Sequence, residues 1–221
     1  MQLYSHLVIA QYLRPALQPQ DLAEYYWGAV APDIRYLLKL PRRRTHPLLT
    51  EARPWLAAHL AGARDFALGY WAHLLADQRD AAGFLYERIP MRQLRKKLPR
   101  GLAGLLVEHA YIRQVPFQAR LSGSQNALLD ELGVPPAAAA QYAAALNAFL
   151  AQPTFPAALG AAEALGLAGN PRIQGYLRSA LWLERSALLR RLALALVKLD
   201  WLTPAILAEL AKEPPLTPLA P

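Results

Sequence analysis

Cysteine is absent from the 221 residues of the chain. Its absence excludes disulfide bonds and thiolate metal sites, so any metal would be held by histidine, carboxylate or backbone oxygen atoms. The sequence also lacks a glycine-rich phosphate loop, a GxSxG nucleophile motif, a repeat of fixed period and a nucleic-acid-binding motif. The function must therefore be inferred from individual polar residues and their positions.

A membrane-spanning segment and a secretory signal are also missing from the sequence pattern. The longest uncharged run, residues 132–162, is interrupted by Pro135, Pro136, Pro153 and Pro156, which argues against a membrane span. The first residues, MQLYSHLVIAQYL, contain neither a basic region nor a small-residue cleavage site. We therefore expect a cytoplasmic protein with no transmembrane segment.

Helix-forming residues dominate the composition. Hydrophobic residues make up 54% of the chain, alanine and leucine are abundant, and β-branched residues are scarce. This composition predicts an all-α fold with a sizeable core. The formal net charge of +8 suits contact with phosphates, nucleic acid or an anionic membrane, although many soluble proteins are simply rich in arginine.

Hydrophobic periodicity, capping residues and prolines predict where the helices lie. Ser5, Asp33 and Thr203 are the expected N-caps of the first, third and last helices. The basic run at residues 91–100 is expected to be a solvated helix face or a contact surface for an anionic partner. The expected helices before the short last one are residues 4–13, 20–30, 34–40, 50–59, 66–77, 102–114, 130–151 and 172–199.

The segment FALGYWAHLLAD, residues 66–77, is apolar on almost every side of a helix, which predicts a buried helix. It nevertheless carries His73 and Asp77, which lie on one face because they are four residues apart. A buried imidazole and a buried carboxylate are costly unless they have partners. They can pair with each other at a helix end, bond to backbone groups, or bind a metal ion.

Three more polar residues in the first part of the chain extend this pair. His6 lies near the start of the first helix, Asp33 lies in the turn GAVAPDI, and His46 lies in the basic loop PRRRTHPLL. Each has an ordinary alternative, as a solvated or hydrogen-bonded histidine or as a capping carboxylate. Together with the central pair they supply three imidazoles and two carboxylates, a set that suits Zn²⁺ or a similar ion.

The motifs SHLVIA, GAVAPDI, RRTH and ALGYWAHLLAD follow one another in this order between residues 5 and 77. This ordered set resembles the bacterial zinc-dependent phospholipase C family, which shares its all-helical fold with the single-strand-specific zinc nucleases. The resemblance is clear over residues 3–78. It implies a multi-helix bundle of this type and a cluster of three zinc ions that hydrolyses phosphodiesters.

The resemblance can be carried over residue by residue. It implies that Asp33, His46, His73 and Asp77 hold one zinc ion, and we assign Asp33 the catalytic role as well. His6 matches a ligand of a second zinc ion, which Asp77 would bridge to the first. The family's amino-terminal tryptophan, a further ligand of that second ion, has no counterpart in MQLYS.

The third zinc site of the family is altered in this sequence. Gly83 stands where the family has a histidine, six residues after the bridging aspartate. His109 is the candidate for the next ligand, but Arg113 occupies the position of the acidic residue that follows it. The cofactor prediction is therefore one or two zinc ions.

These observations predict a metal-dependent phosphodiester hydrolase, similar to phospholipase C but with a reduced zinc cluster. The substrate is a phosphoester, with phospholipid, nucleic acid and small phosphodiesters all open. Arg42, Arg43 and Arg44 are the candidate substrate-binding residues, unless they are only a solvated cluster. Two alternatives are a non-catalytic relative with one structural metal site and a basic module that binds nucleic acid or anionic lipid.

The chain is expected to form one helical domain. This domain covers residues 1–214, with the metal-site core in residues 1–120 and additional helices in residues 121–214. The proline-rich tail, residues 215–221, is expected to lie outside it.

Overall fold

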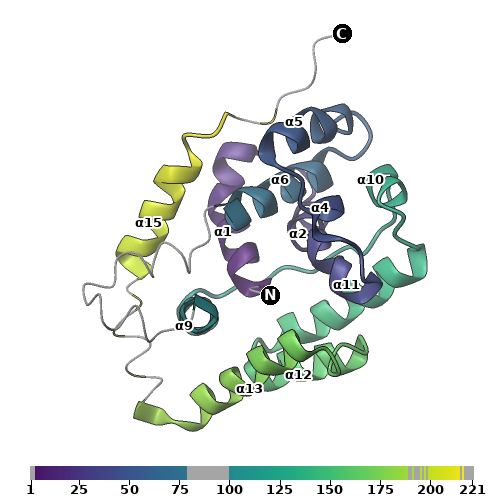
Figure 1. The fold of residues 1–221 in the computed structure, drawn as a ribbon. Coiled ribbons are helices and arrows are strands. Elements are labelled where there is room, and N and C mark those ends of the chain that lie inside the picture. Colours follow the sequence, from purple (N-terminus) through teal and green to yellow (C-terminus); the bar gives the residue numbers. More distant parts are fainter. Residues whose placement is uncertain are drawn as a thin grey trace.

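The computed structural model describes residues 3–78, 100–188, 191, 195, 197, 199–214 and 216. The regular elements of these residues are all helical, which confirms the predicted all-α, multi-helix fold (Figure 1). They are α1 (Leu3–Leu17), α2 (Leu22–Val30), the 3₁₀ helix η1 (Ala31–Ile34), α3 (Arg35–Leu38), α4 (Arg42–Thr45), α5 (Leu49–Ala58), α6 (Arg64–Gln78), α9 (Arg100–Gln114), α10 (Ala127–Glu131), α11 (Pro136–Ala151), α12 (Phe155–Ala164), α13 (Pro171–Arg185) and α15 (Leu199–Leu210).

Helices α2 and α6 cross at very close range in the centre of the fold. A Cβ atom added to Gly28 of α2 would collide with the carbonyl oxygen of Phe66, and one added to Gly69 of α6 would collide with the carbonyl oxygen of Tyr25. Only glycine therefore lets the two backbones approach this closely. The close crossing fixes the position of α6, the central helix predicted from its apolar pattern.

The remaining helices surround this crossing. Helix α1 packs on both α2 and α6, η1 contacts both of them, and α5 packs on α6. Helix α9 packs on α1 and α13, while α11, α12 and α13 pack in succession on one side of the molecule (Figure 1). This arrangement places α6 in contact with both α1 and η1, and these three elements carry most of the predicted ligands.

Several helix boundaries differ from the prediction because tertiary contacts replace local caps. Ser5 lies inside α1, where a distant carboxylate binds the free N–H groups of the first turn. Asp33 lies within η1 and makes no capping hydrogen bond there. Thr203 lies inside α15 and its hydroxyl pairs with that of Tyr111 at 3.1 Å.

Two predicted helices are each interrupted. The segment expected to be helical from residue 130 to 151 begins as α10, turns at Gly133 with a positive φ of 71°, and resumes as α11 at Pro136. Helix α13 ends at Arg185, and Ser186 is not helical, so the helix expected over residues 172–199 is shorter than predicted.

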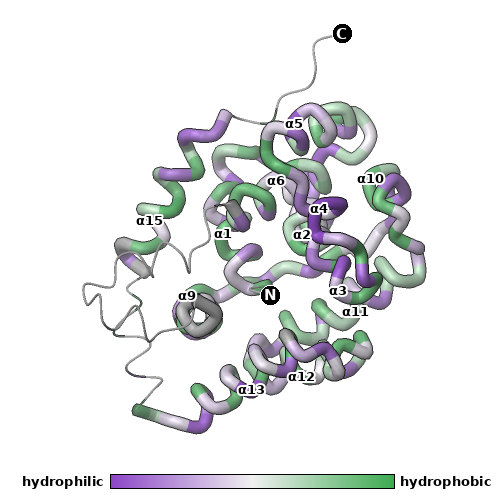
Figure 2. Tube along the Cα trace, in the orientation of Figure 1, coloured by the Kyte–Doolittle hydropathy of each residue, from purple (hydrophilic) through white to green (hydrophobic). Residues whose placement is uncertain are grey.

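Hydrophilic residues are concentrated on α4, in front of the central helices (Figure 2). None of the helices that the structure describes has the length and apolar character needed to cross a bilayer. The basic run at residues 91–99 and Gly83 lie outside the described residues.

Candidate metal centre

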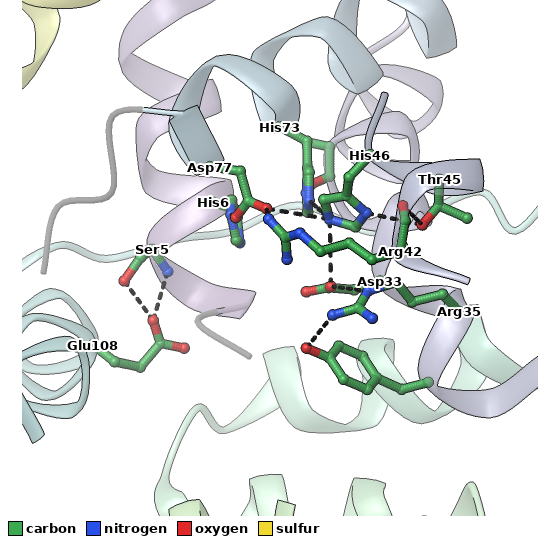
Figure 3. A network of polar contacts seen from close by, with 12 residues as sticks. Ser5, His6, Asp33, Arg35, Arg42, Thr45, His46, His73, Asp77 and Glu108 are labelled. Atoms are coloured by element: carbon green, nitrogen blue, oxygen red, sulfur yellow. Dashed lines mark hydrogen bonds and ion pairs between the residues drawn. The ribbon is translucent and has the colours of Figure 1, made fainter. Parts of the chain in front are cut away.

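Five polar side chains predicted as ligands converge on one place in the fold (Figure 3). Helix α1 supplies His6, η1 supplies Asp33, and His46 directly follows α4. Helix α6 supplies His73 and Asp77 from successive turns of one face. The convergence follows from the close packing of α1, η1 and α6 described above.

His46 lies in the middle of the cluster. Its Nε2 atom is 3.1 Å from Nε2 of His73, 3.3 Å from Oδ2 of Asp77 and 3.8 Å from Oδ1 of Asp33. The imidazole of His6 stacks on that of His73 with ring centroids 4.1 Å apart, and its Nε2 lies 3.1 Å from Oδ1 of Asp77. Every member of the cluster is therefore in direct contact with at least one other member.

Hydrogen bonds at the Nδ1 atoms of His46 and His73 assign the tautomers of these two rings. His73 Nδ1 lies 2.8 Å from the carbonyl oxygen of Ala29, so Nδ1 carries a proton and donates it. His46 Nδ1 lies 2.8 Å from Oγ1 of Thr45, whose hydroxyl donates to the carbonyl of Arg42 at 3.5 Å and therefore accepts from the ring. In the neutral rings both Nε2 atoms then present lone pairs to the same point.

Burial and the neighbouring charges shift the pKa values in the cluster. Burial lowers the pKa of His46 to about 4 and that of His73 to about 3, so both rings are neutral near pH 7. Burial would raise the pKa of Asp33 and of Asp77, but the surrounding imidazoles outweigh it and lower both. Burial would lower the pKa of His6, but its bond to Asp77 outweighs it and raises the pKa.

The donor set fits a zinc ion. Zinc ligands lie about 2.0–2.2 Å from the ion, which places neighbouring ligand atoms roughly 3.3–3.6 Å apart in a tetrahedral site. The separations around His46, 3.1, 3.3 and 3.8 Å, bracket that range. Two neutral imidazoles whose lone pairs face each other at 3.1 Å repel unless a cation lies between them.

The two groups of candidate ligands overlap at one residue. The candidate ligands form two triplets, His6 with Asp33 and His73, and His46 with His73 and Asp77. Both triplets need the same Nε2 atom of His73, because its Nδ1 is bound to a backbone carbonyl. The two triplets are therefore parts of one centre.

The side chains of the three predicted substrate-binding arginines lie in different places. Arg42 Nη2 lies 2.5 Å from Oδ2 of Asp77, at the edge of the cluster. Arg43 pairs with a glutamate of α5 at 3.4 Å, and Arg44 lies 3.5 Å from a backbone carbonyl of α10. The side chains of Asp77 and Arg42 are 23% and 58% exposed, against 4% for His46, so the cluster opens to solvent on the Arg42 side.

The structure places His109 and Arg113 elsewhere. His109 is buried in α9, its ring stacks on Phe155, and its Nδ1 lies 3.5 Å from Oε1 of Glu184. Arg113 binds the same carboxylate at 2.9 Å. Among the residues that the structure describes, no potential metal-binding group includes His109.

Two residues at the site were not predicted. The carboxylate of Glu108 in α9 accepts hydrogen bonds from the backbone N–H groups of Tyr4 and Ser5, both at 2.8 Å, and so holds the turn that carries His6. Arg35 Nε lies 3.9 Å from Oδ1 of Asp33. Neither contact has a signal in the sequence, because one joins residues about a hundred positions apart and the other depends on how α3 continues directly from η1.

Comparison with known proteins adds one match. Residues 4–78 match the model of the family described as zinc dependent phospholipase C. No curated protein and no solved structure matches the chain. The matched segment contains all five residues of the cluster, and the family it matches is the one that the four motifs predicted.

Proposed function

We propose that the chain is a zinc-dependent phosphodiester hydrolase with one zinc ion held by Asp33, His46, His73 and Asp77. The observation that carries the proposal is the pair of neutral imidazoles, His46 and His73, whose Nε2 lone pairs meet 3.1 Å apart beside two ionised carboxylates. Bound zinc supplies a water with a pKa of about 7 and polarises a phosphoryl oxygen.

The protein groups have distinct roles in this proposal. Asp33 stays ionised because its pKa is lowered, and it is the candidate group to accept a proton from the attacking water. Arg42 lies on the exposed side of the cluster, where its guanidinium can bind the anionic phosphoester and offset charge that develops on phosphorus. His6 keeps Asp77 in place through the bond between Nε2 and Oδ1.

Phospholipids, nucleic acids and small phosphodiesters all remain candidate substrates. Each carries the same anionic phosphodiester group, which the guanidinium of Arg42 can bind. The proposal therefore names the phosphodiester as the substrate class.

A second candidate function is supported by the contact between Arg42 and Asp77. A guanidinium that stays on Asp77 closes the exposed side of the cluster. Four protein ligands with no open position make a structural zinc site, which stabilises the fold without hydrolysis.

The test begins with zinc content and turnover of the same protein. We expect about one zinc ion per chain by elemental analysis, and hydrolysis of bis(4-nitrophenyl) phosphate that is lost on chelation and restored by zinc. His73→Ala should lose both zinc and hydrolysis, because its Nε2 belongs to both ligand triplets. His59→Ala is the matched control, since His59 lies outside the cluster and pairs with Glu131.

Circular dichroism separates loss of zinc from loss of fold. If His73→Ala fails to fold, Asp77→Asn provides the second variant, because Asp77 is the most exposed ligand. Zinc-loaded protein that never hydrolyses the diester would support the structural site. Protein that binds no zinc would contradict both functions.

A further inference from the structure

Helix α13 exposes a surface that combines basic and large apolar side chains. Arg178, Trp182 and Arg185 are spaced four and three residues apart, so they lie on one side of the helix, and all three are exposed. Leu188 follows shortly after the helix ends. We call these four residues the α13 surface. The opposite side of the helix is buried in the core through Ile173, Leu177, Ala180 and Leu183.

The apolar side chains of this surface are unusually accessible. Trp182 is 58% exposed and Leu188 is 69% exposed. They are two of the four large hydrophobic residues that are exposed in the part of the chain that the structure describes. Two such side chains within six positions, one on α13 and one just beyond its end, indicate a surface that is covered by a partner.

The charge of the surface is not neutralised by any residue that the structure describes. Neither Arg178 nor Arg185 takes part in an ion pair of the described residues, and Arg178 only contacts the amide oxygen of Gln174 at 3.3 Å. The one acidic residue next to Arg185 in sequence, Glu184, already binds Arg113 at 2.9 Å. The chain as a whole carries a net charge of +8, so a negatively charged partner is favoured over a basic one.

We propose that the α13 surface binds the interface of an anionic lipid bilayer. Tryptophan is favoured at the level of the headgroups, leucine inserts beneath them, and arginines bind the phosphates. Leu188 separates this partner from nucleic acid, because an aliphatic side chain gains little on a phosphate backbone. A second copy of the chain would place like charges of Arg178 and Arg185 against each other in a two-fold interface.

This surface is independent of the metal centre. None of its four residues belongs to the candidate ligand triplets, and α13 lies at the edge of the molecule in Figure 1, whereas the ligands come from α1, η1, α6 and the end of α4. Lipid binding is therefore measurable in zinc-free protein, where the outcome does not depend on hydrolysis.

Cosedimentation with sucrose-loaded vesicles tests the proposal. We expect the zinc-free protein to pellet with vesicles of phosphatidylserine in phosphatidylcholine and to stay in solution with phosphatidylcholine alone. Trp182→Ala and the double variant Arg178→Gln/Arg185→Gln should each lower the partition coefficient on the order of tenfold, because they remove the inserted ring and the headgroup contacts respectively. These exposed changes should leave the melting temperature unchanged.

The matched control removes the same charge elsewhere. Lys39→Gln/Arg120→Gln neutralises two exposed basic residues away from α13 and should keep most of the binding. Equal losses in the two double variants would show unspecific attraction and overturn the proposal. It is also overturned if the native protein does not pellet, if Trp182→Ala converts a dimer into a monomer, or if Trp182→Ala weakens single-stranded DNA binding and leaves vesicle binding intact.

Discussion

His46 and His73 are neutral because the fold takes them out of water and gives the protons of their Nδ1 atoms to oxygen acceptors. His73 donates to a backbone carbonyl at 2.8 Å, and His46 donates to the hydroxyl of Thr45 at 2.8 Å. An imidazole that is already neutral and oriented loses no proton when it binds a metal ion. The hydrogen bond that Nδ1 of each ring donates therefore leaves Nε2 unprotonated and oriented for coordination.

These two residues also make the stability of the zinc-free protein depend on pH. Their folded pKa values, about 4 and about 3, lie below the ordinary value of 6.5. At pH values between the folded and the ordinary pKa, the unfolded chain therefore binds more protons than the folded protein. The free energy of unfolding should fall as pH is lowered, by about 3 kcal/mol from roughly pH 7 to 5 after the opposite contribution of His6, whose pKa is raised. Urea denaturation at the two pH values measures the change.

The variant His46→Gln provides the comparison for this pH dependence. It removes one of the two groups with a lowered pKa, so its stability should fall less over the same pH interval. An equal fall in the variant and in the native protein would assign the effect to other residues.

At the scale of the elements, the crossing of α2 and α6 holds the metal centre together. Gly28 and Gly69 let the backbones touch, and His73 lies one turn beyond Gly69 on α6. Because η1 follows α2 directly, the same crossing sets the distance between Asp33 and α6. A small displacement of α6 therefore moves His73 and Asp77 relative to Asp33.

Gly69→Ala should be strongly destabilising. The new methyl group collides with the carbonyl oxygen of Tyr25, and overpacking of this kind costs about 1–3 kcal/mol or more. Thermal unfolding should show the loss, and isothermal titration should show weaker zinc binding. Gly160→Ala, in an exposed turn of α12 with no neighbour within 4 Å, should instead be neutral or stabilising. Similar melting temperatures for the two variants would contradict the close crossing.

At the scale of the whole molecule, the centre joins segments that are far apart in the sequence. The cluster connects α1, η1, the end of α4 and α6, and Glu108 connects α1 to α9. A ligand that binds only when these segments are in place stabilises the folded state as a unit. Zinc binding is therefore expected to report on the integrity of the N-terminal half of the fold.

Zinc should raise the melting temperature of the chelated protein. Free zinc at about 100 times its dissociation constant stabilises the folded state by about 2.7 kcal/mol. Differential scanning calorimetry across a zinc titration measures the shift, and magnesium serves as the control ion because it disfavours nitrogen ligands. A melting temperature that does not change when zinc is added, or that rises equally with magnesium, would rule out a site built from His46 and His73.

Much of the fold and of the candidate ligand set was predictable because it depends on local pattern. The apolar segment around His73 and Asp77 predicted a buried helix, and the four ordered motifs predicted the family that residues 4–78 match. Helix ends were less predictable, since Ser5 and Thr203 pair with distant groups in place of acting as local caps. The role of the five ligands in zinc binding stays a prediction for the experiments above.

The sequence by itself determined the helical class, the absence of thiolate ligands and the identity of the imidazoles and carboxylates, because composition and periodicity act through each residue's own chemistry. Only the tertiary structure decided that both ligand triplets share one nitrogen of His73, that Arg42 lies against Asp77, and that His109 lies elsewhere beside Glu184. These outcomes depend on where whole helices cross, and that is set by packing between segments distant in the chain.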